Sequence, residues 1–347
     1  MKDIFDPEFL SAEDIERACG AFASKLERRE FLKKASAWTG GLLLAGGLGV
    51  LAGCGGKTGL SKKAVPGTSP TSSTAPAASS VADLAVATGQ GPGQMALKAV
   101  DALGGMGRFV KPGNVVVIKP NASFMAGPES GTSTHPEVVG QVISMCREAG
   151  ASRVIVMDHC LRGSPQVCLA GNGIGEAARQ AGAEVIAYDG GDRGHGVDAA
   201  VPQGVNLKQV NVYPEVLSAD VVITVPKAKH HGSAGLSLGM KNFIGVVTNM
   251  STIHNHDLHQ AIADLNTLVK PRLSVIDASV ILLDNGPGGP GPTRNANTVI
   301  ASGDVVAADS YACTLFGMSA TDVPYIVNGN RAGLGEVDFN KLNIARV

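Results

Sequence analysis

Short apolar runs alternate with helical patterns along residues 81–347. Several runs are continuous and rich in valine and isoleucine, as expected for strands buried on both faces of a parallel sheet. The predicted strands are 81–88, 114–120, 152–159, 183–189, 219–225, 272–278 and 297–302. The predicted helices between them are 93–105, 136–150, 173–182, 257–269 and 304–317. This alternation predicts an α/β fold, with a mostly parallel sheet, helices on both of its faces and a possible division into two lobes.

The helix predicted at 136–150 has a distinct start in the sequence. The residues Thr134-His135-Pro136-Glu137 place a glutamate three positions after a threonine. This spacing is typical of a capping box, in which the hydroxyl accepts a hydrogen bond from the first helical turn. We therefore expect Thr134 to cap this helix.

Polar side chains follow several predicted strands at their carboxyl ends. Lys119 and Asn121 come after one apolar run, and Asp158 comes after the next run. Ligands of open α/β sheets bind outside the carboxyl ends of the strands, so these side chains are expected to meet at one edge. We predict catalytic roles for Lys119 and Asp158 and a ligand-binding role for Asn121.

The segment 226–245 is the richest in candidate chemistry. Lysines offer cationic donors to a carboxylate or phosphate, and histidines transfer protons or bind metals. An ordinary solvated loop is the alternative interpretation of this segment. Its predicted catalytic residues are Lys229, His230 and Lys241, and its predicted ligand-binding residues are His231 and Asn242.

A second group of histidines follows closely. His254, His256 and His259 lie within six residues, together with Asp257. Imidazole and carboxylate ligands suit a transition metal, so the three histidines are predicted metal ligands, although their spacing matches no standard metal motif. No C-x-x-C sequence occurs, which argues against a self-contained iron–sulfur cluster.

Cys160 and Cys168 flank a short loop, and their chemistry stays open at this point. In an oxidising compartment the two thiols would pair as a disulfide. Alternatively, either cysteine would serve as a metal ligand or a nucleophile.

The N-terminal 54 residues have the pattern of an export signal. The paired arginines Arg28 and Arg29 precede an uncharged, glycine-rich apolar stretch at 35–53. A positive flank before a modestly apolar stretch resembles a twin-arginine signal, which is read by the twin-arginine export machinery. Leu51-Ala52-Gly53-Cys54 resembles a lipobox, so Cys54 is predicted to be lipidated and to become the mature N-terminus.

Residues 55–80 are expected to be a flexible linker. The segment consists mostly of Pro, Ser, Thr, Ala and Gly and has no apolar periodicity, so it cannot bury a core. Together, the signal and this linker predict an exported protein held to a membrane by a lipid, facing the periplasm or the cell exterior. The formal net charge is −1 and we find no basic stripe, so nucleic acid is not an expected partner.

An ordered set of motifs resembles a known family. The motifs are KPN (119–121), a Thr/His/Pro helix start (132–136), VMDHC (156–160), VPKAKHH with GMKNFIG (225–245), IDA with NGPGGPG (276–291) and SGDVVAADSYA (302–312). They follow one another as in the family called domain of unknown function 362. The resemblance implies the domain and no agreed reaction. Some relatives carry a ferredoxin module, which this chain lacks.

Two functions fit these features. One is a metal- or cofactor-dependent enzyme that acts on a small anionic substrate, with lysines holding the anion and a histidine serving as base or metal ligand. The other is a non-catalytic ligand-binding or cofactor-delivery lipoprotein, which the long linker and the lack of a known catalytic motif favour. A bound ligand without turnover would distinguish the second function from the first.

Overall fold

The computed structural model describes residues 81–347, apart from residues 90, 162 and 190–193. The described residues belong to one compact unit, Ala78–Val347, and are not divided into two lobes. The predicted signal at 1–54, including Cys54, and the predicted linker at 55–80 lie outside the described residues.

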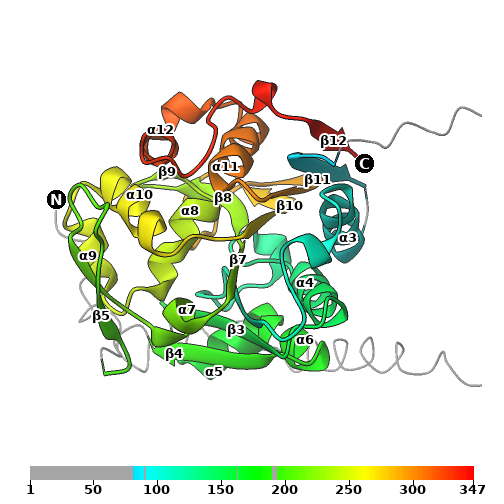
Figure 1. Ribbon diagram of the computed structural model, residues 1–347, viewed down its shortest axis with the longest axis horizontal. Coiled ribbons are helices and arrows are strands. Elements are labelled where there is room, and N and C mark those ends of the chain that lie inside the picture. Colours follow the sequence, from blue (N-terminus) through cyan, green and yellow to red (C-terminus); the bar gives the residue numbers. More distant parts are fainter. Residues whose placement is uncertain (1–80, 90, 162, 190–193) are drawn as a thin grey trace, which may run out of the picture. The chain divides into compact units, whose positions relative to one another are not determined.

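A mostly parallel sheet forms the centre of the described part of the chain (Figure 1). β8 (Lys227–His231) pairs with β10, and β9 (Gly235–Ser237) pairs with β8. Along the main path of the sheet, β11 runs antiparallel to both of its neighbours, and the other described pairings are parallel. The strand order of that path is β12 (Ile344–Arg346), β1 (Leu84–Thr88), β11 (Thr293–Ser302), β10 (Leu273–Leu282), β7 (Val221–Val225), β2 (Val115–Pro120), β3 (Arg153–Cys160) and β4 (Glu184–Asp189).

Helices cover both faces of this sheet, as the sequence predicts. One face packs on α3 (Pro92–Ala102), α4 (Pro136–Glu148) and α6 (Ile174–Gln180) through strand residues such as Ala85. The other face packs on α10 (Leu258–Leu268), α11 (Val305–Cys313) and α12 (Pro324–Arg331) through residues such as Val86. Ala85 and Val86 are consecutive in β1, so their side chains point to opposite faces. The α/β fold class is therefore confirmed.

The apolar runs of the sequence predict the central strands and helices well. Short or polar helices and strands have no apolar run and are not predicted. Each of the seven predicted strands and five predicted helices overlaps an observed element. Apart from short 3-10 helices, the described elements without a predicted counterpart are short or polar. They are α5 (Pro165–Asn172), α7 (Pro214–Ser218), α8 (Gly239–Asn242), α9 (Met250–His254), α12, β8, β9, β12 and the separate hairpin of β5 (Val197–Ala200) with β6 (Gln209–Val212).

The predicted capping box at the start of α4 is wrong. The N-cap is His135, whose Nδ1 accepts a hydrogen bond from Glu137 N at 3.2 Å. The Thr134 hydroxyl donates instead to Val225 O at 2.8 Å and accepts from Asn121 N at 2.9 Å. Tertiary contacts therefore take the hydroxyl away from the helix and use it to join β2 to β7.

The chain order reverses direction at the pair of β2 and β7. From β2 the chain continues outward to β3 and β4, whereas β7 and β10 are added on the other side of β2. This is a topological switch point, where the crevices of open α/β sheets lie. The polar residues that follow β2, β3 and β7 therefore meet where a ligand site is expected.

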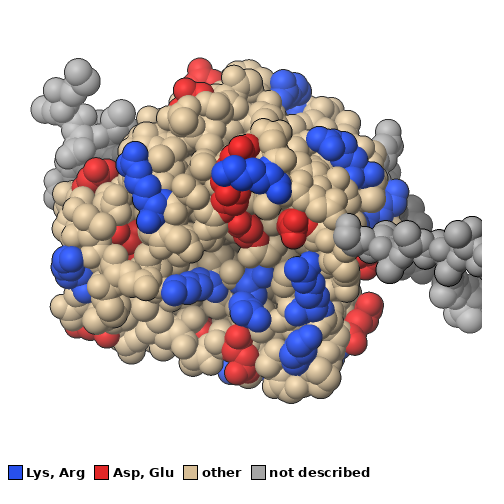
Figure 2. Space-filling model, turned by 45° about the horizontal axis from the view of Figure 1, so that its top comes forward, with Lys and Arg blue, Asp and Glu red and all other residues tan. Residues whose placement is uncertain are grey.

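Charge is mixed on the surface. Figure 2 shows acidic and basic side chains on the same face of the protein, in keeping with the net charge of −1. Within residues 81–347, leaving out the gaps given above, no helix is both long and apolar enough to cross a membrane.

Candidate anion site at the carboxyl edge of the sheet

Asn242 joins the two strands at the switch point. Its Nδ2 donates to Lys119 O of β2 at 2.7 Å and to Thr224 Oγ1 of β7 at 3.0 Å. Its Oδ1 accepts from Lys119 Nζ at 2.9 Å and from Asn121 Nδ2 at 2.8 Å. The predicted ligand-binding residues Asn121 and Asn242 are thus brought together, and both amide groups are used to hold the edge of the sheet.

Lys119 and Asp158 form a buried ion pair. Lys119 Nζ lies 2.9 Å from Asp158 Oδ1, and both side chains are almost fully buried. Asp158 Oδ2 accepts from Ala122 N at 2.6 Å and from Ser123 Oγ at 3.1 Å. Burial lowers the pKa of Lys119, and the charge of Asp158 opposes this shift. The structure therefore brings these two predicted catalytic residues together as a closed pair whose hydrogen-bonding groups are already occupied.

Gly245, in the short helical turn Phe243–Val246, lies directly against this pair. A Cβ at this position would come within 2.6 Å of Lys119 Cε and 2.7 Å of Asp158 Oδ1. We therefore expect Gly245→Ala to lower the free energy of unfolding by about 1–3 kcal/mol, because the buried pair must shift. Unfolding by urea, followed by circular dichroism, measures this change.

Gly140→Ala is the matched control for that substitution. Gly140 lies in α4, and a Cβ at this position would lie 3.9 Å from Ala177 O, an ordinary van der Waals distance. Alanine is favoured over glycine in a helix, so this variant should gain roughly 0.5–1 kcal/mol. Equal effects of the two substitutions would contradict the close approach of Gly245 to the ion pair.

β8 carries its lysines on one face. In the strand Lys227-Ala228-Lys229-His230-His231, alternate side chains share a face, so Lys227, Lys229 and His231 point to the same side. All three are buried, whereas His230 on the other face is about one-third exposed. The segment is therefore a buried strand at this point, and its interpretation as a solvated loop is wrong there.

Lys227 forms a second buried ion pair, with Asp277 of β10. Its Nζ lies 2.9 Å from Asp277 Oδ2, and both side chains are fully buried. Asp277 also accepts hydrogen bonds from His135 N at 2.7 Å and from Ser279 Oγ at 2.6 Å. The charge of Lys227 and the hydrogen bonds from Ser279 overcome burial and hold the pKa of Asp277 below its usual value. This pair is not among the predicted site residues.

Lys229 is buried without a carboxylate partner among the described residues. Its Nζ donates to Thr132 O at 2.5 Å and lies 5.0 Å from the centre of the Phe124 ring. Burial, together with the nearby charge of Lys241, lowers the pKa of Lys229 to about 7. A carbonyl and a ring face are weaker partners for an ammonium group than a carboxylate.

Lys241 of α8 is the second such lysine. It is 8% exposed, and no residue in the described part of the chain forms a hydrogen bond or an ion pair with its Nζ. Burial and the charge of Lys119 lower the pKa of Lys241 to about 7. A neutral amine is a usable base or nucleophile, and its charged form would attract an anion.

Asp309 of α11 positions the helix that carries Lys241. Its two carboxylate oxygens accept from Gly239 N at 2.7 Å and from Met240 N at 2.9 Å, the first backbone groups of α8. A Cβ at Gly239 would come within 2.8 Å of Asp309 Oδ1, so the close approach requires glycine. Burial raises the pKa of Asp309 to about 7. Asp309 is not among the predicted site residues, although the motif SGDVVAADSYA (302–312) includes it.

Two histidines lie beside the unpaired lysines. His231 Nδ1 accepts from Ser233 N and Ala234 N, both at 3.2 Å, and burial with the charge of Lys241 lowers its pKa to about 2. His254 Nδ1 lies 2.9 Å from Met250 O, which can only accept, so Nδ1 carries the hydrogen and Nε2 keeps a free electron pair. Burial lowers the pKa of His254 as well. Both rings are therefore neutral near pH 7.

His230 has a different role from that of its neighbour. Gly286 N donates to His230 Nδ1 at 3.1 Å, and a Cβ at Gly286 would overlap His230 O. His230 thus holds the loop of residues 284–291 against β8. The predicted catalytic role of His230 stays a prediction.

The comparisons with known proteins identify the family. Residues 116–314 match the family model described as "Domain of unknown function (DUF362)", which is more than half of the chain. The chain belongs to this family. The matched region of the DUF362 family spans β2 to α11 and so includes every site residue described above.

Two individual proteins are similar to this chain. "Thylakoid-associated protein sll1697" of Synechocystis sp. is 28% identical over 243 residues, which cover 68% of this chain and 73% of that protein. A solved structure of the lactate racemase apoprotein from Thermoanaerobacterium thermosaccharolyticum aligns with a TM-score of 0.45 at 12% identity. That alignment covers 66% of this chain and 56% of the racemase chain, so the chain spans little more than half of the racemase.

The predicted metal ligands are not gathered in the described part of this DUF362 chain. There, no three His, Cys, Asp or Glu side chains are arranged to hold a metal ion. His254 bonds back to its own helix, His256 is exposed between α9 and α10, and the His259 ring stacks on Tyr325. The helix of residues 258–268 starts after His256, so His256 and His259 do not share a helix face. The metal site stays a prediction.

Cys160 and Cys168 are joined by a disulfide. Of the two alternatives that the sequence left open, the structure has the cystine. The bond ties α5 to the end of β3, two residues after Asp158. It therefore fixes the backbone beside the Lys119–Asp158 pair.

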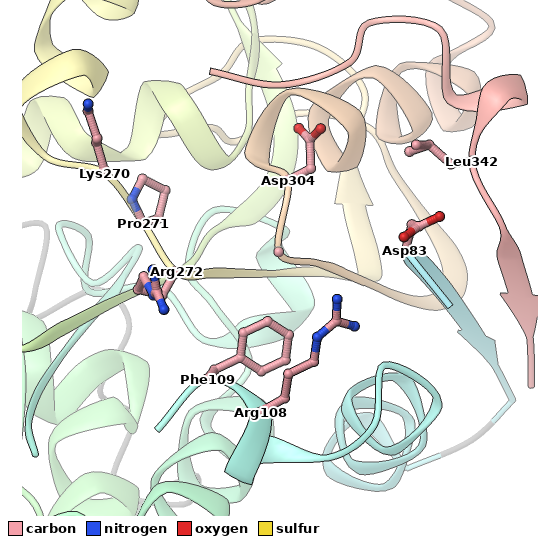
Figure 3. A pocket seen from close by; sticks show the side chains of 9 residues that line it. Asp83, Arg108, Phe109, Lys270, Pro271, Arg272, Asp304 and Leu342 are labelled. Carbon is pink, nitrogen blue, oxygen red and sulfur yellow. The ribbon is translucent and has the colours of Figure 1, made fainter. Parts of the chain in front are cut away.

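A separate cavity lies at the opposite edge of the sheet. It has a volume of about 460 Å³, and Figure 3 shows Arg108, Arg272 and Phe109 on one side of it and Asp304 and Asp83 on the other. Arg272 precedes β10 and Asp83 precedes β1, so this cavity is at the amino ends of those strands. The switch-point residues Lys229 and Lys241 do not line it.

Proposed function

We propose that this DUF362 protein is an exported, lipid-anchored enzyme that acts on a small anionic substrate held by Lys229 and Lys241. The observation that carries the proposal is the presence of two buried lysines without a carboxylate partner among the described residues. Buried cations without a counter-charge are costly, and an anionic ligand would supply the missing charge. Their position at a topological switch point supports a ligand site.

Proton transfer in this enzyme would fall to the neutral groups beside the anion. His254 keeps a free electron pair on Nε2, and it lies within reach of the charge of Lys241. His254 would then remove a proton from the bound substrate, because Lys241 is charged while it holds the anion. Lys119 and Asp158 would act by holding the edge of the sheet, since their bonding capacity is already taken. The metal or cofactor requirement stays a prediction.

One observation favours the alternative, a non-catalytic ligand-binding or cofactor-delivery lipoprotein. The two carboxylates of the site, Asp158 and Asp277, are both held by a lysine and by backbone or hydroxyl donors. They are therefore poor candidates for a free acid or base. A site of unpaired lysines alone is sufficient to hold an anion without turnover.

A turnover test separates these two functions. The full chain, purified in detergent, would be incubated with a panel of small carboxylates and phosphate esters, and their consumption followed by NMR. Loss of a transition-state contact to Lys241 should lower the rate by about 100-fold or more in Lys241→Met. Lys98→Met, which changes an exposed lysine of α3, is the control that keeps full activity. Binding without turnover would favour the lipoprotein alternative, and neither binding nor turnover would contradict the site.

The export and anchoring parts of the proposal have their own support. The Arg28-Arg29 pair, the apolar stretch and Cys54 supply the signals in the sequence. A disulfide is a bond of oxidising compartments, and Cys160 and Cys168 form one. The relative from Synechocystis is named as thylakoid-associated, which supports a place at a membrane surface.

Replacing Arg28 and Arg29 together with lysine is expected to block export. The twin-arginine machinery reads the arginine pair itself, and lysine cannot reproduce the planar guanidinium. Cell fractionation with an antibody against the folded domain measures the exported fraction. Lys33→Arg with Lys34→Arg, which keeps the charge outside the pair, is the control. Unimpaired export of the Arg28/Arg29 variant would indicate the general secretory route.

A further inference from the structure

The charges at the carboxyl edge of the sheet do not balance. Four lysines, Lys119, Lys227, Lys229 and Lys241, are buried there. Two carboxylates, Asp158 and Asp277, neutralise Lys119 and Lys227 at 2.9 Å each. The other two lysines have no such partner in the part of the chain that the structure describes.

The groups around the two unpaired lysines add no further negative charge. Lys229 faces the charges of Lys241, Asp158, Lys119 and Lys227, and Lys241 faces Lys119. The rings that feel the charge of Lys241 are His159, His231 and His254, and all three have a lowered pKa. The carboxylate of Asp309 is turned to the start of α8, where it accepts two backbone hydrogen bonds. The site is therefore short of two negative charges when both lysines are protonated.

We infer that the ligand of this site is a dianion, such as a dicarboxylate or a phosphate monoester, and that its binding takes up protons onto Lys229 and Lys241. This inference rests on the proposed function, because it concerns the same anion site. One negative charge for each unpaired lysine would complete the pattern of paired charges that Lys119 and Lys227 already follow. A monoanion would leave one buried ammonium group without a negatively charged partner.

Proton uptake follows from the electrostatics of the ligand-free site. Burial and neighbouring positive charge lower the pKa of each lysine to about 7, so both are mostly neutral at pH 8 before a ligand binds. An anion beside each amine favours the charged form and raises the pKa again. Between one and two protons should therefore enter with each dianion at pH 8, and binding should weaken as the pH rises.

Isothermal titration calorimetry at pH 8 measures the affinity of the ligand. Repeating it with the full chain in two buffers of different ionisation enthalpy gives the number of protons taken up. The probes are malonate and inorganic phosphate as dianions and acetate as a monoanion. A dianion should bind about tenfold more tightly than acetate or better, because it forms one further close charge pair. Lys241→Met should take up about one proton fewer and lose the preference for the dianion, whereas Lys98→Met should match the unchanged chain. Malonate and phosphate distinguish a dicarboxylate from a phosphate ligand.

Three results would overturn all or part of the inference, and they differ in what else they overturn. If acetate binds as tightly as the dianions, the ligand is not a dianion. If binding takes up no protons, the two lysines are already charged in the ligand-free protein and the proton-uptake part is wrong. In both cases the anion site still stands. If none of the probes binds at millimolar concentration, both the dianion and the proposed anion site are wrong. Circular dichroism of each variant shows whether it is folded, so a loss of binding is assigned to the site.

Discussion

Asp277→Asn is expected to lower the free energy of unfolding by about 3–5 kcal/mol, because it leaves a buried charge without its partner. Lys227 and Asp277 are both fully buried and 2.9 Å apart. The carboxylate also holds the backbone at His135 and the hydroxyl of Ser279. Urea unfolding followed by circular dichroism measures the loss. Tryptophan fluorescence is unsuitable, since Trp38 is the one tryptophan and lies in the predicted signal.

Two further variants make this result specific. Asp284→Asn changes an aspartate whose side chain is 73% exposed, and its effect should stay within roughly 0.5 kcal/mol. Lys227→Met combined with Asp277→Asn should be more stable than Asp277→Asn alone, because the buried cation is removed with its partner. A loss below about 1 kcal/mol for Asp277→Asn would contradict a buried pair at this position.

Lys241→Met is expected to stabilise the ligand-free protein while it weakens dianion binding and removes the preference for a dianion. The substitution keeps the unbranched side chain, one atom shorter, and removes an ammonium group that has no partner in the described residues. Replacing a poorly compensated buried charge by an apolar side chain typically gains about 1–4 kcal/mol. Stability gained together with function lost is the mark of a binding residue, since a residue that only supports the fold would lose both.

The pH dependence of this gain has a definite sign. The unfolded chain keeps the Lys241 proton up to its usual pKa of 10.5, whereas the folded protein releases it near pH 7. Between these values the unfolded state binds more protons, so the stability of the unchanged chain rises with pH, by at most about 1.4 kcal/mol per unit for this lysine.

The stability gap between Lys241→Met and the unchanged chain should therefore be largest below pH 7 and narrow toward pH 10. Urea unfolding at a series of pH values measures the gap. Lys98→Met should run parallel to the unchanged chain over the same range, because Lys98 is exposed. A gap for Lys241→Met that does not change with pH would show that this lysine is not desolvated.

The sequence is informative where a pattern is local. The buried valine and isoleucine runs predict the central strands, and the rule that ligands bind at carboxyl ends selects Lys119, Asn121 and Asp158. β8 is not predicted because a strand of lysines and histidines has no apolar signal. Its lysines are buried only because Asp277, fifty residues later, and Thr132, almost one hundred residues earlier, supply partners.

The roles of the predicted residues are harder to obtain than their positions. Lys119 and Lys241 are alike in the sequence, yet the structure pairs Lys119 with Asp158 and leaves Lys241 unpaired among the described residues. Asp309 is absent from the predicted site, since an aspartate inside a helix pattern usually faces solvent. Whether a lysine has a carboxylate partner depends on contacts between residues far apart in the chain, and a single sequence does not show these contacts.

The claim that Lys229 and Lys241 form an anion site is tested most directly by anomalous diffraction from a crystal of the protein grown with selenate. The account predicts a selenium peak whose oxygens lie about 2.7–3.2 Å from both Nζ atoms, the range of a hydrogen bond. Selenate peaks at other places only, with Lys241 Nζ bonded to a carboxylate of the chain, would contradict it.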